Sequence, residues 1–392
     1  MTSEWHEVPL RELVGYISKG IAPSYAEEES ETTIRVLNQK CNRNFQISYG
    51  DSRLHDTLKK KVPPERYVKP DDILINSTGA GTAGRIAQIE DVPSATTIDG
   101  HMILIRSNGK VTQKFLGYAL KAHQWEVLQL DEGSTGQTEL NRERLLDEIM
   151  INYPVSFDEQ NAIVGTLESI DRKLIVNEQL NDNLQRQASA LYGKYFPYAV
   201  TDDLPAGWRV GTVGEIVELH DSKRIPLSGA QRAKMEKRIY PYYGAASLMD
   251  YVDEYIFDGK YLLLGEDGTV MDDAGFPILQ YVWGQFWVNN HAHILTGKLG
   301  FNVESLLLLF KRTPVKSIVT GAVQPKISQA NLRSIQVVVP PQHELDAFNE
   351  LIRPLFEQIR QNQDQSKALT SLRDALLPKL MSGEIDVSDI RL

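Results

Sequence analysis

The sequence predicts a mixed α/β fold (α+β) in which a globular segment followed by one long helix occurs twice. Two stretches, residues 156–196 and 342–381, place apolar residues at alternating steps of three and four, which is the spacing of a coiled-coil seam. The segments in front of both stretches contain short alternating runs typical of strands. A repeat of this length indicates a tandem duplication with a pseudo-twofold axis, not a solenoid.

Length and composition agree with several domains. A chain of 392 residues has room for two or three of them, and a hydrophobic content of 42% suits buried cores. We expect globular segments at residues 1–155 and 200–341, a central helix at 156–199, and a second helix with a tail at 342–392.

The start and the end of each globular segment carry matching landmarks. Trp5 and Trp208 each precede a short helix-like segment. Each long helix follows a short strand that ends in proline, at residues 149–154 and 335–340. These matches support the duplication.

The chain is expected to be cytoplasmic and to have no membrane span. Cys41 is its single cysteine, so no internal disulfide can form. A run of about 18 apolar residues, which a spanning helix needs, does not occur. Residues 1–7 are acidic and lack the apolar region of a signal peptide.

The net charge of −10 argues at first against binding to nucleic acid. However, acidic residues outnumber basic ones in both helical segments, while basic residues cluster early in each globular segment. The clusters are Arg53, Lys59, Lys60, Lys61, Arg66 and Lys69 in the first segment, and Lys223, Arg224, Arg232, Lys234, Lys237 and Arg238 in the second. Either cluster alone is typical of a solvated loop. Their recurrence in both copies favours a phosphate-facing role.

Four strands and one helix are expected in the first globular segment. The strands are predicted at residues 34–38, 72–76, 85–89 and 101–106. Residues 115–130 have helical spacing, and the residues that share one face are Phe115, Tyr118, Ala119, Ala122 and Trp125.

Residues 79–84 (GAGTAG) satisfy the glycine pattern of a dinucleotide-binding turn. In that motif the glycines admit a pyrophosphate to the N-terminus of a following helix. Here residues 85–89 have a strand pattern and Pro93 follows, so no helix opens after the glycines. A glycine-rich turn is the favoured interpretation. Such a turn can face DNA, because small residues let backbone N–H groups approach phosphate.

The two long helices are expected to lie side by side. Ser156 and Glu159 form the pattern of a capping box at the start of the first. A helix of about 40 residues spans ~60 Å. A single helix of this kind could be a spacer between domains, whereas two helices with matched polar breaks indicate a pair.

The polar breaks lie midway along each seam, at Asn177 and Asn181 in one helix and at Asn362 and Ser366 in the other. Buried asparagine at such positions usually fixes the pairing register at some cost in stability. Pro354 interrupts the pattern of the second helix and is expected to kink it or to leave a carbonyl free.

The second globular segment repeats features of the first. Residues 261–264 are predicted to form a buried strand, and residues 265–268 take the place of the glycine-rich turn. His101 and His291 fall at equivalent strand starts, and a structural role is the favoured interpretation for both. His291 and His293 alternate across a strand and could bind a metal, but no Asp, Glu or Cys partner lies at a recognised spacing.

Aromatic residues are dense in this second segment, and they are Tyr240, Tyr242, Tyr243, Tyr251, Tyr255, Tyr261, Tyr281, Trp283, Phe286 and Trp287. Most are expected in the core. Any that are exposed can stack on bases or deoxyribose if the surface faces DNA.

Several catalytic signatures are missing. The absence of a P-loop argues against an NTPase. The Asn/Asp-Pro-Pro-Tyr/Phe signature of amino-methyltransferases is also missing, since both Pro-Pro pairs, at residues 63–64 and 340–341, follow valine. Asp258-Gly-Lys260 matches a fragment of a nuclease site, but Asp-Gly is an ordinary turn.

These features together carry a resemblance to a known family. The motifs lie at residues 34–41 (IRVLNQKC), 73–81 (ILINSTGAG), 261–268 (YLLLGEDG), 324–328 (QPKIS) and 372–384 (LRDALLPKLMSGE). With the duplicated layout, they make the chain resemble the DNA-specificity (S, HsdS) subunit of type I restriction–modification systems over essentially its whole length. Pro354 departs from the family pattern, in which this helix is usually smooth.

The resemblance implies a recognition subunit without catalysis of its own. The two globular segments would be target-recognition domains that read the two halves of a bipartite, asymmetric double-stranded DNA target. The helices would form an antiparallel coiled coil that docks two methyltransferase (M) subunits, with motor–nuclease (R) subunits joining them. No cofactor is expected on this chain, whereas S-adenosylmethionine, ATP and Mg are expected on the partner subunits.

Polar and basic side chains in the major groove can distinguish base pairs, which selects the candidate DNA-binding residues. They are Asn38, Lys40, Arg43, Lys59, Lys60, Lys61, Ser77 and Thr78 in the first segment, and Lys223, Arg224, Lys234, Lys237, Glu266, Asp267 and Lys326 in the second. Two alternatives stay open. One is a DNA-modifying enzyme with its own methyltransferase or nuclease site, and the other is a coiled-coil scaffold that does not read DNA.

Overall fold

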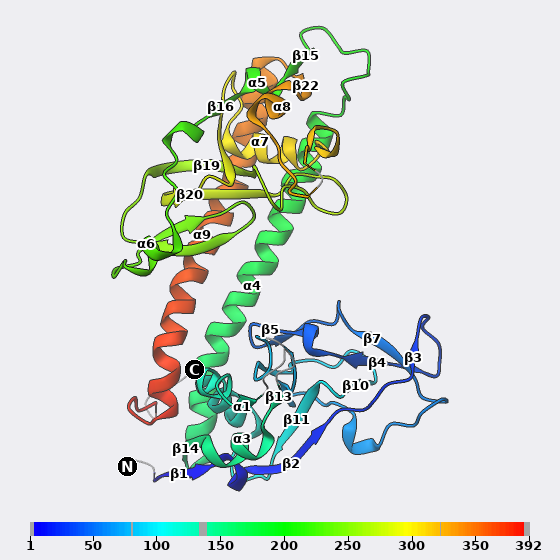
Figure 1. The fold of residues 1–392 in the computed structure, drawn as a ribbon, viewed down its shortest axis with the longest axis vertical. Coiled ribbons are helices and arrows are strands. Elements are labelled where there is room, and N and C mark those ends of the chain that lie inside the picture. The colour runs from blue at the N-terminus through cyan, green and yellow to red at the C-terminus, as the bar shows by residue number, and fades with distance from the viewer. Residues whose placement is uncertain (1–3, 80, 133–138, 322, 388–392) are drawn as a thin grey trace. The chain divides into compact units, whose positions relative to one another are not determined.

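The computed structural model describes residues 4–79, 81–132, 139–321 and 323–387. The chain divides into two compact units, which we call unit 1 (residues 1–175 and 365–392) and unit 2 (residues 176–364). Two long helices, α4 (Phe157–Tyr195) and α9 (Gln342–Met381), each contribute one part to unit 1 and the other part to unit 2 (Figure 1). Among the described residues, no helix is both long and apolar enough to cross a bilayer.

Both units contain the same antiparallel four-stranded arrangement, which confirms the predicted duplication. In unit 1 the order is β2 (Val14–Lys19), β11 (Met102–Ser107), β8 (Ile73–Asn76) and β9 (Ile86–Gln88). In unit 2 the order is β16 (Val217–Leu219), β21 (Ala292–Gly297), β19 (Phe257–Gly265) and β20 (Leu279–Val288).

The helices and strands that flank these sheets also correspond. In unit 1 they are β1 (Trp5–Pro9), α1 (Gln113–Ala122), α3 (Arg142–Glu148) and β14 (Met150–Pro154), and β1 pairs with β14. In unit 2 they are β15 (Arg209–Thr212), α7 (Val303–Phe310), α8 (Gln329–Ser334) and β22 (Gln336–Val339), and β15 pairs with β22. The duplication therefore extends from the first strand of each unit to the strand that leads into its long helix.

The units differ in the strands added to this common framework. Unit 1 adds a second sheet of order β10 (Thr96–Ile98), β4 (Thr33–Leu37), β7 (Arg53–Asp56) and β3 (Tyr25–Ala26). Unit 2 instead extends its main sheet beyond β20 by β17 (Tyr240–Tyr243) and β18 (Leu248–Val252), next to the short helix α6 (Gly229–Ala233). We call these additions the added layers.

Shorter elements complete the chain. They are β5 (Asn42–Arg43), β6 (Gln46–Ile47), α2 (Gln124–Val127), β12 (Asp131–Glu132), β13 (Glu139–Leu140), α5 (Val213–Ile216) and the 3-10 turns Leu10–Glu12, Gln39–Cys41, Pro64–Arg66, Asp221–Lys223 and Lys316–Ile318.

Each unit has its own apolar core between its sheet, its flanking helix and its share of the long helices. In unit 1, Phe115 and Leu116 of α1 are fully buried and pack with Ile163 and Leu167 of α4. In unit 2, every residue of α7 is buried, and Phe348 of α9 belongs to the same core. Burying a large apolar side chain stabilises a fold by roughly 1.5–3 kcal/mol, so these faces hold the helices to the sheets.

The tryptophan landmarks hold the start of each long helix. The indole Nε1 of Trp5 donates to Glu159 at 3.2 Å, and that of Trp208 donates to Glu344 at 3.3 Å. Ser156 accepts from the backbone N–H of Glu159 at 3.4 Å, which is one half of the predicted capping box. The carboxylate of Glu159 accepts its hydrogen bond from the Trp5 indole, a contact that a local motif does not predict.

The two long helices pair antiparallel, and the polar seam predicted from sequence is buried in unit 2. Asn362 Nδ2 donates to Asn181 Oδ1 at 2.9 Å, and Asn181 Nδ2 donates to the carbonyl of Ile359 at 3.4 Å. Asn177 Nδ2 donates to the carbonyl of Asn362 at 3.3 Å. Asn181 and Asn362 are 6% and 4% exposed, so both lie inside the seam as expected.

A helix break and a proline set the local geometry of two predicted helices. The helix predicted at residues 115–130 is wrong as one element, because α1 ends at Ala122 and α2 begins at Gln124. The break at His123 changes the helical register, and Trp125 is 74% exposed instead of sharing the apolar face. Pro354 does not interrupt α9, which is helical from Gln342 to Met381. Because proline has no N–H, the carbonyl four residues earlier loses its helical donor.

Candidate nucleic-acid interface

The two units build the same turn at the end of a central strand. In unit 1, Ser77 follows β8 and its N–H donates to the carbonyl of His101 at 2.8 Å. In unit 2, Glu266 follows β19 and its N–H donates to the carbonyl of His291 at 2.8 Å. The residues predicted from the two glycine-containing motifs thus occupy equivalent positions.

A histidine side chain faces each turn. His101 Nδ1 lies 2.7 Å from Thr78 Oγ1, and His291 Nδ1 is hydrogen-bonded to the carboxylate of Asp267. Each histidine lies one residue before its strand, β11 or β21, as the sequence comparison of the two copies predicted. We call these two groups the histidine turns.

The backbone of each histidine turn is held by a second acidic or amide side chain. Asp99 Oδ1 accepts the N–H of His101 at 2.9 Å, and Asn289 Oδ1 accepts the N–H of His291 at 2.8 Å. Burial raises the pKa of the Asp99 carboxyl, although the hydrogen bond from the His101 backbone opposes that rise. In both copies a buried polar side chain, Asp99 or Asn289, therefore accepts a hydrogen bond from the backbone of the turn.

The glycine-rich stretch of unit 1 is a turn and not a nucleotide cradle. Gly79 and Gly84 have φ angles of 114° and 84°, which side chains with a Cβ rarely adopt. Strand β9 begins at Ile86, so no helix N-terminus follows that could receive a pyrophosphate. This confirms the interpretation as a turn.

Among the candidates of unit 1, Lys40 and Arg43 have exposed side chains, Lys40 shortly after β4 of the added layer and Arg43 on β5, which contacts β8 and β9. Asn38 is occupied locally, because its Oδ1 accepts from Lys40 N at 2.9 Å and its Nδ2 donates to the carbonyl of Asp51 at 2.7 Å. Ser77 is fully buried. Asn38 and Ser77 can therefore hold the surface in place, whereas Lys40 and Arg43 are free to reach a ligand.

The three consecutive lysines of unit 1 follow β7 at the margin of the added layer. Lys59, Lys60 and Lys61 are all exposed. Lys59 Nζ lies 3.7 Å from Asp56, and Lys60 Nζ donates to the carbonyl of Ala22 at 2.8 Å. The basic cluster found in the sequence is thus a surface feature of the layer in which the two units differ.

In unit 2 the candidates separate into exposed and internal residues. Lys223, Lys234, Lys237 and Lys326 are exposed, and Lys326 Nζ lies 3.4 Å from Glu266. Arg224 is mostly buried, donates to the carbonyl of Ala292 at 2.8 Å and forms an ion pair with Glu266. Arg224 and Glu266 therefore neutralise each other beneath the surface.

Apolar side chains accompany the exposed lysines of unit 2. Strand β18 is the edge strand of the six-stranded sheet. Its Leu248, Met249 and Tyr251 are 42%, 54% and 43% exposed, and Tyr255 is 41% exposed. Most of the other aromatics predicted for the core are buried or half-buried. The exposed edge was not predicted, because strand order within a sheet is not visible in a local pattern.

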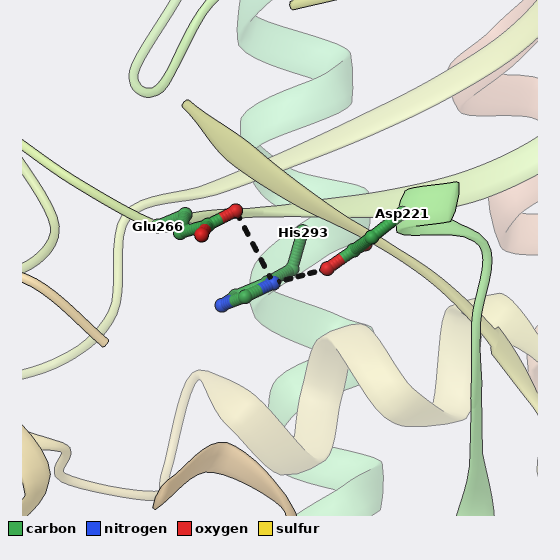
Figure 2. A group of neighbouring side chains, drawn as sticks. All are labelled: Asp221, Glu266 and His293. Carbon is green, nitrogen blue, oxygen red and sulfur yellow. Dashed lines mark hydrogen bonds and ion pairs between the residues drawn. The ribbon is translucent and has the colours of Figure 1, made fainter. Parts of the chain in front are cut away.

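A polar network lies beneath the histidine turn of unit 2. His293 Nδ1 is 2.6 Å from Asp221 Oδ2 and 3.7 Å from Glu266, and Figure 2 shows the imidazole between the two carboxylates. Donor atoms of these three residues lie within 4.8 Å of one another, a spacing compatible with a metal ligand set. Asp221 is the acidic partner that the sequence spacing did not reveal, since it precedes His293 by 72 positions.

The hydrogen bonds of this network argue against metal binding. His293 Nε2 lies 2.8 Å from the carbonyl of Ile327, which can only accept, so this nitrogen carries a proton. Nδ1 faces the Asp221 carboxylate, which also accepts from Gln329 at 2.6 Å. Burial opposes ionisation of Asp221, but the His293 hydrogen bond and charge outweigh it and hold the pKa of this carboxyl below its usual range. The arrangement is a buried ion pair, with no ring nitrogen left for a metal.

Comparison with known proteins gives a consistent result. Residues 2–186 and 205–370 match the family model described as the type I restriction modification DNA specificity domain. The chain is 25% identical to the type I restriction enzyme MjaIX specificity subunit of Methanocaldococcus jannaschii, covering 99% of this chain and 95% of that one. It is 24% identical over 168 residues to the type I restriction enzyme EcoprrI specificity subunit of Escherichia coli, covering 41% of each. The S subunit of a type I restriction–modification system from M. genitalium has a similar solved fold, with a TM-score of 0.58, 18% identity and coverage of 97% and 96%.

Proposed function

This chain belongs to the type I restriction modification DNA specificity family, and we propose that its two repeats read the two halves of one bipartite, asymmetric DNA target. The chain is a DNA-recognition subunit of a type I restriction–modification complex. It is not itself catalytic and needs no cofactor of its own. We assign target recognition to residues 1–155 and 200–341, and spacing and docking to the helical segments 156–199 and 342–392.

The observation that carries this proposal is the contrast between a common framework and different added layers. The central strands have the same order in both units, whereas the strands joined to them differ in number and connection. Basic residues lie on or beside both added layers. Equal scaffolds with unequal reading surfaces suit a target whose two halves have different sequences.

The exposed basic residues are the ones we expect to contact DNA directly. In unit 1 they are Lys40, Arg43, Lys59, Lys60 and Lys61, and in unit 2 they are Lys223, Lys234 and Lys237, whereas the exposed Lys326 is paired with Glu266. Lysine and arginine supply the phosphate contacts that dominate affinity, and some of them can reach base edges in the major groove. Asn38, Ser77, Arg224 and Glu266 are expected to position this surface, because their polar atoms are bonded within the fold.

The remaining candidates, Thr78, Asp267 and Lys326, belong to the histidine turns or to the strand bridge beside one of them. The apolar edge of β18 adds a different kind of contact. Side chains such as Leu248 and Met249 can touch a thymine methyl group, which an all-polar surface does not do.

The complex would also contain two methyltransferase subunits and motor–nuclease subunits. S-adenosylmethionine, ATP and Mg would be bound by those partners and not by this chain. In each unit, the long helices expose faces that do not pack on the sheet, including Val176 and Leu351 in unit 2 at 39% each, and such faces suit protein docking.

Retention of duplex DNA by the purified complex tests this proposal. We expect one duplex containing the bipartite target to be retained at least about 1,000-fold more tightly than a shuffled duplex, which is the lower end of the range usual for specific DNA binding. Equal retention of both duplexes would favour the scaffold alternative. Binding of S-adenosylmethionine by the isolated chain would favour the enzyme alternative.

A further inference from the structure

The two histidine turns keep the same hydrogen bonds although their residues differ. The side chain that meets Nδ1 is Thr78 in unit 1 and Asp267 in unit 2. The hydrogen bond to Nδ1 is therefore kept although its partner is a hydroxyl in one unit and a carboxylate in the other. A backbone turn alone does not require this contact, because the peptide hydrogen bonds hold the turn whichever side chain stands at the histidine position.

Both histidines present the same chemistry to the outside. Asp267 is a carboxylate and can only accept, so His291 Nδ1 donates to it, and in the tautomer with this single ring proton Nε2 is the acceptor. Thr78 Oγ1 donates to Gln39 Oε1 at 3.4 Å, so it accepts from His101 Nδ1 and again leaves Nε2 as an acceptor. His101 is exposed and the side chain of His291 is 44% exposed. Within the described part of the chain, neither Nε2 has a hydrogen-bond partner.

The histidine turn occurs in both units, so we expect it to bind a ligand that is also the same at both units. Residues that read bases are expected to differ between units, since the two half-sites differ. Two ligands are the same for both units: the sugar–phosphate backbone, and a protein subunit that binds once to each unit.

The local charge favours the protein. In unit 1 the strand bridge beside the turn brings Glu139, which is paired with Lys19, next to Thr78. In unit 2 the turn contains Glu266, which is paired with Arg224 and Lys326, and Asp267, which is bonded to His291. Because these carboxylates already have cationic or histidine partners, neither turn presents a net positive charge that would attract a phosphate. An outward acceptor nitrogen repels phosphate oxygen but suits an N–H or O–H donor from a protein.

An exposed apolar residue next to the turn of unit 2 supports the same choice. Val323 is 99% exposed, and its loop is tied to the turn because Gly268 N–H donates to the carbonyl of Pro325 at 3.0 Å. A fully exposed valine gains by burial against another protein. The corresponding segment of unit 1, residues 133–138, lies outside the described residues.

We propose that the two histidine turns are docking points for two copies of one protein subunit, one per unit, each copy donating a hydrogen bond to Nε2 of His101 or His291. This inference rests on the function proposed above, under which the subunit is the methyltransferase partner. It adds to the long helices a contact on each globular part.

Partner binding by the full-length chain tests the proposal. Asparagine in place of histidine keeps an amide N–H near the position of Nδ1 and removes Nε2, so His101→Asn and His291→Asn preserve the internal bond. We expect each variant to weaken one of two partner-binding steps about 10-fold, or ~1.4 kcal/mol, and to leave the other step unchanged. Titration with purified methyltransferase subunit and native mass spectrometry measure both steps. His6→Asn, an exposed histidine outside the turns, is the matched control.

Val323→Ser is a second variant that cannot disturb the fold, because the side chain touches almost nothing. We expect it to weaken the same step as His291→Asn, by about threefold. Unchanged partner binding in all three variants overturns the proposal. Loss of DNA affinity with intact partner binding also overturns it and assigns the turns to the phosphate backbone. If the wild-type complex binds partners but not a specific DNA sequence, the proposed function fails separately.

Discussion

The buried asparagines between α4 and α9 allow a sharp test of the packing in unit 2. Asn362 Nδ2 is the donor to Asn181 Oδ1 at 2.9 Å, and both residues are nearly inaccessible. Asn362→Ala removes that donor and leaves a buried acceptor unsatisfied, which costs about 1–3 kcal/mol. Alanine is a better helix former than asparagine by about 0.5 kcal/mol. The net expected loss of stability is therefore about 1–2 kcal/mol.

Replacing both asparagines by leucine should leave the free energy of unfolding nearly unchanged or raise it. The variant Asn181→Leu with Asn362→Leu removes donor and acceptor together and extends the apolar seam, so its free energy of unfolding is expected within about 1 kcal/mol of the wild type, or above it. Urea denaturation followed by circular dichroism gives these values. Asn183→Ala, on the exposed face of α4, is the control and should change stability by only a few tenths of a kcal/mol. A double-leucine variant less stable than Asn362→Ala would refute the reasoning.

Three further perturbations follow from the site and the fold. Lys40→Ala should weaken DNA binding and lower the slope of log affinity against log salt by about 0.9, as expected for one lost phosphate contact. The control Lys110→Ala should leave both unchanged. An unchanged slope in Lys40→Ala would remove Lys40 from the interface. Asp221→Asn should destabilise unit 2 by about 3 kcal/mol, because His293 loses its buried counter-charge. The folded pKa of Asp221 lies below its ordinary value of 3.8. The free energy that this shift contributes to stability is therefore fully present above pH 3.8 and is lost as the pH falls through the folded pKa. The Asp221→Asn variant should lack this contribution at every pH. In thermal melts, Trp125→Ala should change stability by less than about 0.5 kcal/mol, whereas Phe115→Ala should cost about 3–5 kcal/mol. Equal effects of the two substitutions would indicate that Trp125 is part of the core.

The parts of the fold that were predictable are those encoded by local periodicity. The seams of α4 and α9 follow from apolar spacing, and their mutual burial follows from the asparagines, because a polar residue inside a seam needs a partner. The duplication was visible because equivalent strands, such as β8 and β19, are followed in the sequence by similar glycine-containing turns. Boundaries were less predictable where a single residue, such as His123, ends a helix within a helical pattern.

The candidate site was predictable only in part, because its contacts join distant segments. The equivalence of His101 and His291 could be read from two similar strand starts. The pairing of His293 with Asp221 could not, since no spacing rule covers two residues brought together by sheet formation. The same holds for Arg224, which looked like a free cation in the sequence and is an internal partner of Glu266 in the fold.

The central claim is that each unit reads one half of a divided target, and a map of methylated bases in the genome tests it most directly. With the wild-type chain, the map should show one motif with two different halves separated by a constant gap. With Lys40→Ala and Arg43→Ala together, both in unit 1, sequence preference should relax in one half while the other half and the gap stay unchanged. A continuous motif, or relaxation of both halves at once, would contradict the account.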